Sequence, residues 1–183
     1  MIRKRNEPEN FHAPLYLACG KGEYRESPKL HYIYFIDGYA HATNAHVLIK
    51  QSLDYCGVID KKKLNGKCIH RDDYKSILKY NRVVATDNNI VCYEKDGSRK
   101  MFKYGEETPL EFEKVYEQWS NTSEISELCV DMKLVEIATK CLYNYSNYLK
   151  FSLVVAENCK GLKIECKDSD YANQFALVLG MYY

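Results

Sequence analysis

The chain has 183 residues, which is enough for one or two domains and for a core that buries roughly 70% of the unfolded surface. Lys plus Arg number 26 and Asp plus Glu 25, so the net charge of +1 demands neither a nucleic-acid nor a membrane partner. A near-neutral total can still place a basic face opposite an acidic one. No run approaches the roughly 20 apolar residues that span a bilayer. The polar and charged residues 1–10 do not resemble a secretory segment. We expect a cytoplasmic protein with no membrane partner.

The eight cysteines fall singly, mostly inside apolar runs, and no C-x-x-C motif occurs. They are Cys19, Cys56, Cys68, Cys92, Cys129, Cys141, Cys159 and Cys166. Scattered cysteines of this kind are typical of small buried side chains in a reducing compartment. A zinc site is the alternative, but no pair of cysteines or histidines has finger or ribbon spacing. We therefore expect no metal and no cofactor.

The first structured part of the chain is expected to be one short helix and three strands. Residues 1–10 read as a tail, and residues 11–22 as a helix begun near Pro14 and ended at a glycine, with a strand as the alternative. Strands follow at 30–36, 39–43 and 46–52. Asp37-Gly38 joins the first two strands, because a type I′ hairpin turn needs positive φ at both central residues.

A second set follows a connector that contains three consecutive lysines. Residues 67–69 read as a short strand. The segment 70–80 reads as a helix, since Tyr74, Ile77 and Leu78 have helical spacing. Three strands at 82–86, 90–95 and 99–104 come next, separated by turn sequences.

A third set begins after a crossing loop at 105–123, in which we expect one helical turn. Residues 128–130 read as a strand, and Asp131 caps a helix with an apolar stripe. Strands at 149–156, 162–167 and 171–181 close the chain, with turns at 158–161 and 167–170.

One pattern therefore occurs three times, at 10–53, 66–105 and 126–183: a lead-in, a helix and three antiparallel strands. A period of about 60 residues with little identity indicates repeated supersecondary units rather than a solenoid. The fold class expected is α+β, with three βαβββ repeats and helices on one face of antiparallel sheets.

In three stretches, at residues 42–48, 105–116 and 176–181, the chain resembles the bacterial DNA sliding clamp family, the β subunit of DNA polymerase III. Residues 42–48, ATNAHVL, resemble the family's strand–turn–strand A-T-D-G-H-R-L. Residues 105–116 resemble its crossing loop G-x-F-P-D-Y-x-x-V-x-P. The final strand 176–181, ALVLGM, resembles a family ending like Y-V-V-M-P-M. The βαβββ unit is also the one from which clamps are built, so the resemblance covers nearly the whole chain.

The resemblance implies a shortened clamp, since a bacterial subunit has six such repeats. It implies half a clamp-like domain at 10–56 and a complete one at 57–183. Val47 replaces the usual Arg, Asn44-Ala45 replaces Asp-Gly, and Gly180 replaces a Pro. Encircling a duplex would require self-association, so a homo-oligomer is one expectation.

No catalytic constellation emerges from the residues. Asp72, Asp73 and Asp87 could form a metal-dependent nuclease cluster, but acidic residues at a helix start and a turn already have structural reasons to be there. His41 and His46 could bind a metal with Cys56, although a strand histidine is more often satisfied or exposed. We expect a non-enzyme with no catalytic residues.

Two binding functions are implied by the resemblance, and both remain open. Sequence-independent contact with double-stranded DNA would use the basic residues of the helices and their ends, namely Lys75, Lys79, Arg82, Lys133 and Lys140. A pocket for a polymerase-type peptide motif would be formed by Thr43, His46, Val47, Leu48, Leu177, Leu179 and Met181. We expect a DNA replication or repair accessory or a peptide-docking module. The alternatives are a pure protein-interaction module without DNA binding and a metal-dependent nucleic-acid enzyme.

Overall fold

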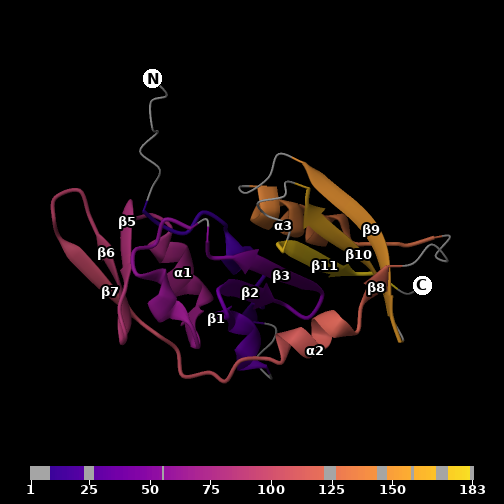
Figure 1. The fold of residues 1–183 in the computed structure, drawn as a ribbon, viewed down its shortest axis with the longest axis horizontal. Coiled ribbons are helices and arrows are strands. Elements are labelled where there is room, and N and C mark those ends of the chain that lie inside the picture. The colour runs from indigo at the N-terminus through magenta and orange to yellow at the C-terminus, as the bar shows by residue number, and fades with distance from the viewer. Residues whose placement is uncertain are drawn as a thin grey trace.

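The structure is a computed structural model that describes residues 9–22, 27–54, 56–121, 127–143, 148–157, 159–167 and 173–181. It has an α+β fold in which antiparallel sheets carry the described helices (Figure 1). The α-helices are α1 (Arg71–Ile77), α2 (Phe112–Glu117) and α3 (Met132–Tyr143). Short 3₁₀ helices lie at Leu15–Leu17, Pro28–His31 and Lys61–Leu64.

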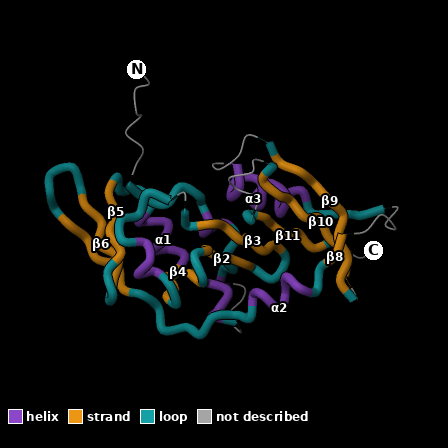
Figure 2. Tube along the Cα trace, viewed as in Figure 1, coloured by secondary structure: helices purple, strands orange, loops and turns teal. Residues whose placement is uncertain are grey.

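Eight strands form one sheet and three form another. The larger sheet has the order β4-β1-β2-β3-β11-β10-β9-β8, and the smaller one has the order β5-β6-β7 (Figure 2). The strands of the larger sheet are β1 (Tyr32–Ile36), β2 (Tyr39–Thr43), β3 (Val47–Ser52), β4 (Lys67–His70), β8 (Ser120–Asn121), β9 (Leu149–Ala156), β10 (Cys159–Cys166) and β11 (Phe175–Leu179). Those of the smaller sheet are β5 (Arg82–Ala85), β6 (Asn89–Tyr93) and β7 (Arg99–Lys103).

The hairpin predicted at Asp37-Gly38 is confirmed. Asp37 has a φ of 48° and Gly38 a φ of 81°, so both central residues have the positive φ that a type I′ turn requires. The turn sets the register in which Ile36 opposes Tyr39 and Tyr34 opposes His41.

The two faces of the larger sheet are covered by different helices. Successive residues of a strand point to opposite faces of the sheet. Phe35 and Ile49 therefore lie on one face, and Tyr34 and Leu48 lie on the other. Phe35 and Ile49 belong to the main core, together with Tyr74 of α1, Leu142 of α3 and Leu15. The prediction that the helices near 70–80 and 131–143 lie on one side of the sheet is therefore confirmed.

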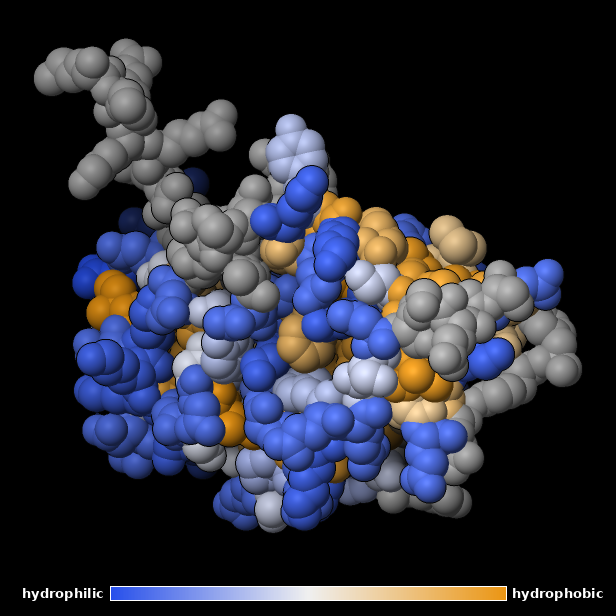
Figure 3. Space-filling view, turned by 45° about the vertical axis from the view of Figure 1, so that its right-hand side comes forward, coloured by the Kyte–Doolittle hydropathy of each residue, from blue (hydrophilic) through white to orange (hydrophobic). Residues whose placement is uncertain are grey.

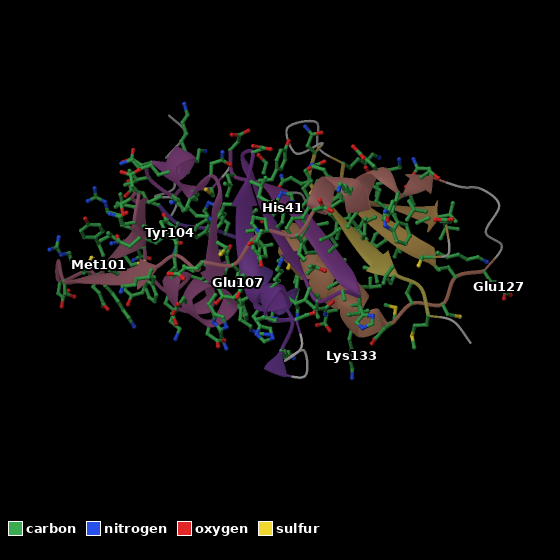
Figure 4. All side chains as sticks on the ribbon, turned by 90° about the horizontal axis from the view of Figure 1, so that it is seen from below. His41, Met101, Tyr104, Glu107, Glu127 and Lys133 are labelled. Carbon is green, nitrogen blue, oxygen red and sulfur yellow. The ribbon has the colours of Figure 1, made fainter. Side chains whose placement is uncertain are left out.

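The opposite face carries the crossing segment instead. A second apolar cluster contains Tyr34, Leu48, Cys68, Phe112, Val154 and Leu177. Phe112 belongs to α2, which runs along this side of the sheet (Figure 1). Lys133 of α3 points away from the sheet in the view from below, whereas His41 lies inside the molecule (Figure 4). The sheet thus separates α2 from α3, so the expectation that the helices lie on one face only is wrong for α2, because the crossing segment packs Phe112 against the opposite face.

Several predicted boundaries are wrong, each for a local reason. The helix expected from Pro14 is a single 3₁₀ turn at Leu15–Leu17, because the chain turns again at Ala18. Residues 28–31 form a 3₁₀ turn, so β1 begins at Tyr32 rather than at residue 30. The strand expected at 128–130 is reduced to an isolated bridge between Val130 and Gly180.

Other boundaries hold or lie partly outside the described residues. β2 and β9 have the predicted limits. β10 begins at Cys159, inside the turn that was expected at 158–161. The expected strand 171–181 is described only from residue 173 onward, where it contains β11. Asp131 caps α3, since its Oδ1 accepts the Lys133 N–H at 2.8 Å.

The order of a helical turn followed by three antiparallel strands occurs three times among the described residues. In the first two sets, the segment that precedes each set pairs with a strand of the other. β4, which precedes the second set, pairs with β1 of the first, and Glu9, which precedes the first set, forms a parallel bridge with Arg82 of β5. The third set extends the sheet of the first through β11 and β3. The domain limits 10–56 and 57–183 stay a prediction.

Six of the eight cysteines are buried, as expected for small apolar side chains, while Cys129 is exposed and Cys159 half-buried. Burial raises the pKa of the Cys19 thiol to about 12 and also raises that of Cys141. All eight cysteines lie in the described part of the chain, and no disulfide forms among them.

Candidate functional site

The predicted pocket is built around the turn between β2 and β3. The Asn44 Oδ1 atom accepts the N–H groups of His46 at 3.0 Å and Val47 at 2.9 Å. The Thr43 hydroxyl donates to the Val47 carbonyl at 2.8 Å, and Ala45 adopts a φ of 72°. Asn and Thr side chains stabilise turns by bonding to nearby backbone in this way. The turn is therefore fixed by its own side chains.

The C-terminal strand lies directly beside this turn. β11 pairs antiparallel with β3, so that Leu177 opposes Leu48, and the Leu179 N–H donates to the His46 carbonyl at 2.9 Å. More than a hundred residues separate these segments in the sequence. Their predicted adjacency is confirmed.

A cavity of about 340 Å³ opens at this junction. Its floor comes from β2, β3 and β11, and its opposite wall comes from the crossing segment. The lining residues are Leu30, Thr43, Ala45, His46, Val47, Leu48, Leu110, Phe112, Val115, Gln118, Trp119, Ala156, Cys159, Leu177 and Leu179. Most of these side chains are apolar, and a few polar groups stand among them. Cavities of this size and composition accept apolar ligand groups.

Six of the seven residues predicted for the pocket line this one cavity: Thr43, His46, Val47, Leu48, Leu177 and Leu179. Met181 is outside the lining. It is 49% exposed, and its backbone N–H donates to the Cys129 carbonyl at 2.7 Å. The structure therefore brings together most of the predicted set, while peptide binding itself stays a prediction.

Sequence reasoning missed the wall that the crossing segment contributes. Phe112, Val115 and Trp119 are spaced by three and four residues, which places them on one face of a helix. Trp119 also packs over the sheet, because a Cβ added at Gly161 would lie 2.9 Å from its ring. The helical spacing is the signal that could have identified this wall.

A buried aromatic cluster holds α2 against the sheet next to the cavity. The His41 ring stacks on Phe112 with centroids 4.7 Å apart, and its Nδ1 lies 2.6 Å from the Tyr116 hydroxyl oxygen. The Lys50 Nζ lies 4.8 Å from the Tyr116 ring centroid and forms an ion pair with Glu113 at 3.0 Å. These contacts join α2 to β2 and β3.

The same aromatic cluster shifts the pKa values of two of its members, His41 and Tyr116. Burial, with a further contribution from the Lys50 charge, lowers the pKa of His41 from 6.5 to about 3, and a hydrogen bond with the Ile36 backbone opposes the shift. Burial and the nearby Glu113 carboxylate raise the pKa of Tyr116. His41 is therefore a neutral imidazole in the folded protein at neutral pH.

The residues predicted to face DNA have different environments. Lys133 is exposed on α3, while Lys140 forms an ion pair with Glu136 at 2.6 Å. The Lys75 Nζ lies 5.5 Å from the Tyr16 ring centroid. Lys79 and Arg82 stand beside the smaller sheet, where Arg82 pairs with Glu9 at 3.3 Å. DNA contact by this set stays a prediction.

The alternative metal and nuclease clusters have little geometric support. Among the described residues, no group of three or more His, Cys, Asp or Glu side chains could hold a metal ion. His41 is buried against α2, whereas His46 is exposed at the turn. Asp72 lies within 3.7 Å of Arg71 and of the His70 ring, at the start of α1.

Comparisons with known proteins add no relative: no family model matches the chain, and no curated protein matches it. In the part of the chain that the structure describes, no helix is both long and apolar enough to cross a membrane. The class that the fold defines is an α+β protein with an open apolar cavity at the junction of distant strands.

Proposed function

We propose that the chain is a non-enzymatic, clamp-like peptide-docking module that serves DNA replication or repair. The observation that carries the proposal is the cavity at the junction of β3 and β11, lined by six of the seven residues that the clamp resemblance selected.

The contacts around the cavity support a short hydrophobic peptide as the occupant. Leu48 and Leu177 are only 8% and 6% exposed, so they form a floor and not a protruding surface. Val115 is 38% exposed and stands at the opposite wall, where an inserted side chain would cover it. Leu or Phe anchors gain about 25 cal/mol for each Å² of apolar surface removed from water. Val47 at the position of the family's Arg leaves this groove more apolar, so the preferred peptide should differ from the family's.

Binding of double-stranded DNA and assembly into a homo-oligomer belong to the same proposal. The exposed lysines of α1 and α3 lie on the face of the larger sheet opposite α2 and the cavity. A clamp would present this helical face to phosphate groups. The competing function is a pure protein-interaction module, which would use the cavity and bind no DNA.

The decisive experiment is titration of a fluorescent polymerase-type clamp-binding peptide against the wild-type chain and a Leu179→Asp variant. The new carboxylate at position 179 would lie in the cavity. An apolar anchor of the bound peptide would then contact a charged group in place of the Leu179 side chain. We expect a loss on the order of 2 kcal/mol or more if Leu179 contacts a central anchor.

Met181→Asp is the matched control, because Met181 is a neighbouring apolar residue outside the lining. It should bind the peptide within a few-fold of wild type. Equal affinity in all three proteins, each folded by circular dichroism, would contradict the docking proposal. A sizing measurement by light scattering in the same samples decides whether the chain assembles.

A further inference from the structure

A second hollow lies at the opposite end of the molecule, between the end of α1 and the smaller sheet. It has a volume of about 510 Å³ and mixes polar and aromatic side chains. Lys79 and Tyr80 enter it from the end of α1, and Tyr93, Lys95 and Lys100 enter it from β6, β7 and their connecting turn. This end of the molecule is predominantly hydrophilic on the side seen in Figure 3, at the left.

The segment that contributes most of this hollow carries an excess of positive charge. Between residues 79 and 103 there are six Lys or Arg residues and three Asp or Glu residues, against 26 and 25 in the whole chain. The six are Lys79, Arg82, Lys95, Arg99, Lys100 and Lys103. The local net charge of +3 thus exceeds that of the complete sequence, +1.

Five of these six cations form no ion pair with a carboxylate of the described residues: Lys79, Lys95, Arg99, Lys100 and Lys103. Three of the five, Lys79, Lys95 and Lys100, line the hollow together with the carboxylates of Glu94 and Asp96, so three positive and two negative charges give the lining a net charge of +1. Cations gathered on a concave surface raise the local concentration of anions. The hollow can therefore attract an anionic group.

The other side chains that line the hollow offer aromatic rings and hydrogen-bond acceptors in addition to the lysine charges. Tyr80 and Tyr93 offer aromatic rings, and the Arg82 guanidinium lies 5.3 Å from the Tyr93 centroid. Bases stack on such rings and planes. The Glu94 side chain can accept hydrogen bonds from a ribose hydroxyl or a base amino group. The Asp96 carboxylate already accepts the Ser98 N–H at 2.8 Å, which fixes the turn between β6 and β7.

We propose that this hollow binds a nucleotide, with Lys79, Lys95 and Lys100 on its phosphate and Tyr80 or Tyr93 beside its base. The nucleotide is either free or part of a single strand, since both present the same phosphate, sugar and base. This site lies apart from the peptide cavity and does not depend on it.

The test is equilibrium binding at low salt with two probes, a labelled single-stranded DNA 12-mer and a fluorescent adenine nucleotide. The double variant Lys95→Glu/Lys100→Glu should weaken binding of the bound probe at least about tenfold. For the oligonucleotide, the slope of log K against log salt should fall by about 1.4, or about 0.7 for each lost contact. Tight binding of the free nucleotide identifies a nucleotide site proper, and binding of the strand alone identifies a strand site.

Lys160→Glu/Lys167→Glu is the matched control, with the same charge change at two exposed positions in or next to β10, outside both the hollow and the lysines proposed to face DNA. It should leave affinity for both probes within a few-fold, and an equal loss in the two double variants would overturn the assignment. So would the absence of any binding by the wild-type chain. Glu94→Gln separates a nucleotide from a simple polyanion: weaker binding supports contact with sugar or base, while stronger binding contradicts it. All variants carry exposed side chains, and their unfolding midpoints confirm that they fold.

Discussion

The two hollows of this molecule lie against two sheets that follow the same sequence pattern but are covered differently. At the β3–β11 junction, the third set of strands continues the sheet of the first set, and α2 packs on one face of this combined sheet. At the other end, β5, β6 and β7 form a separate sheet that contributes Val83, Ile90 and Phe102 to the main core, while β7 is exposed at four of its five positions. Covering by α2 encloses an apolar cavity, whereas the hollow beside the smaller sheet is lined largely by polar and charged side chains. The difference arises from what packs on the sheet and not from the strands themselves.

The largest expected effect comes from removing the residue that anchors α2. Phe112→Ala deletes a ring that is 3% exposed and contacts both Tyr34 and His41. Truncation of a buried Phe typically costs about 3–5 kcal/mol. Chemical denaturation should report a loss of this size, and hydrogen exchange should increase in α2 before it does in β5–β7.

Val115→Ala provides the control for that comparison, since Val115 belongs to the same helix but is 38% exposed. It should cost less than half as much. If Phe112→Ala instead increased hydrogen exchange in β5–β7 as strongly as in α2, the stability of the smaller sheet would depend on α2. That result would contradict the expected difference between the two ends of the molecule.

The next effect in size is the dependence of stability on pH that His41 contributes at the cavity end. The pKa of His41 falls from 6.5 to about 3 on folding, so below pH 6.5 the unfolded chain binds the extra proton. The free energy of unfolding should therefore decrease by up to about 1.4 kcal/mol for each pH unit as pH falls from 6.5 toward 3. Above pH 6.5 this contribution is fully present and constant.

His41→Gln should remove that part of the pH dependence. Urea denaturation of wild type and variant at pH 7 and about pH 5 measures the difference in slope, in which the carboxylates common to both proteins cancel. Parallel slopes in the two proteins would mean that His41 is protonated in the folded state as readily as in the unfolded one.

A smaller effect sharpens the description of the cavity wall. In Gly161→Ala, the new methyl group would lie 2.8 Å from the Val178 carbonyl oxygen and 2.9 Å from the Trp119 ring. Trp119 can shift, but the backbone of β11 can do so only by disturbing its pairing with β10. We expect a destabilisation of about 1–3 kcal/mol and a change in Trp fluorescence, Trp119 being the only tryptophan.

The neighbouring exposed residue supplies the reference for that measurement. Lys160→Ala changes the same strand without crowding Trp119 and should leave both stability and fluorescence close to wild type. A Gly161→Ala protein indistinguishable from Lys160→Ala would show that Trp119 is not packed over β10.

Sequence reasoning predicted the strands best where turn chemistry and alternation agree. Asp37-Gly38 specifies its turn through positive φ, and Asn44 specifies the next one through its side-chain oxygen, so β2 and β3 were placed within a residue. The limits of the 3₁₀ turn at Leu15–Leu17 could not be predicted, because they depend on packing beneath α1 and α3. Propensity is a weak guide wherever tertiary contacts decide.

The candidate site was predicted in part for a similar reason. Strand residues such as Thr43 and Leu177 were found through a resemblance to motifs. The α2 wall was missed although Phe112, Val115 and Trp119 have helical spacing, because that spacing does not show which face of the sheet the short helix covers. The nucleotide hollow was missed because Lys79 and Lys100 are far apart in sequence and meet only when the β6–β7 hairpin folds back toward α1.

The most direct test of the docking proposal is a methyl NMR titration of the wild-type chain with the clamp-binding peptide. The account predicts shifts of the Leu48, Val115, Leu177 and Leu179 methyl groups, which line the cavity, and no change for Val84 or Val91 of the smaller sheet. Shifts confined to Val84 and Val91, or no shifts at saturating peptide, would contradict it.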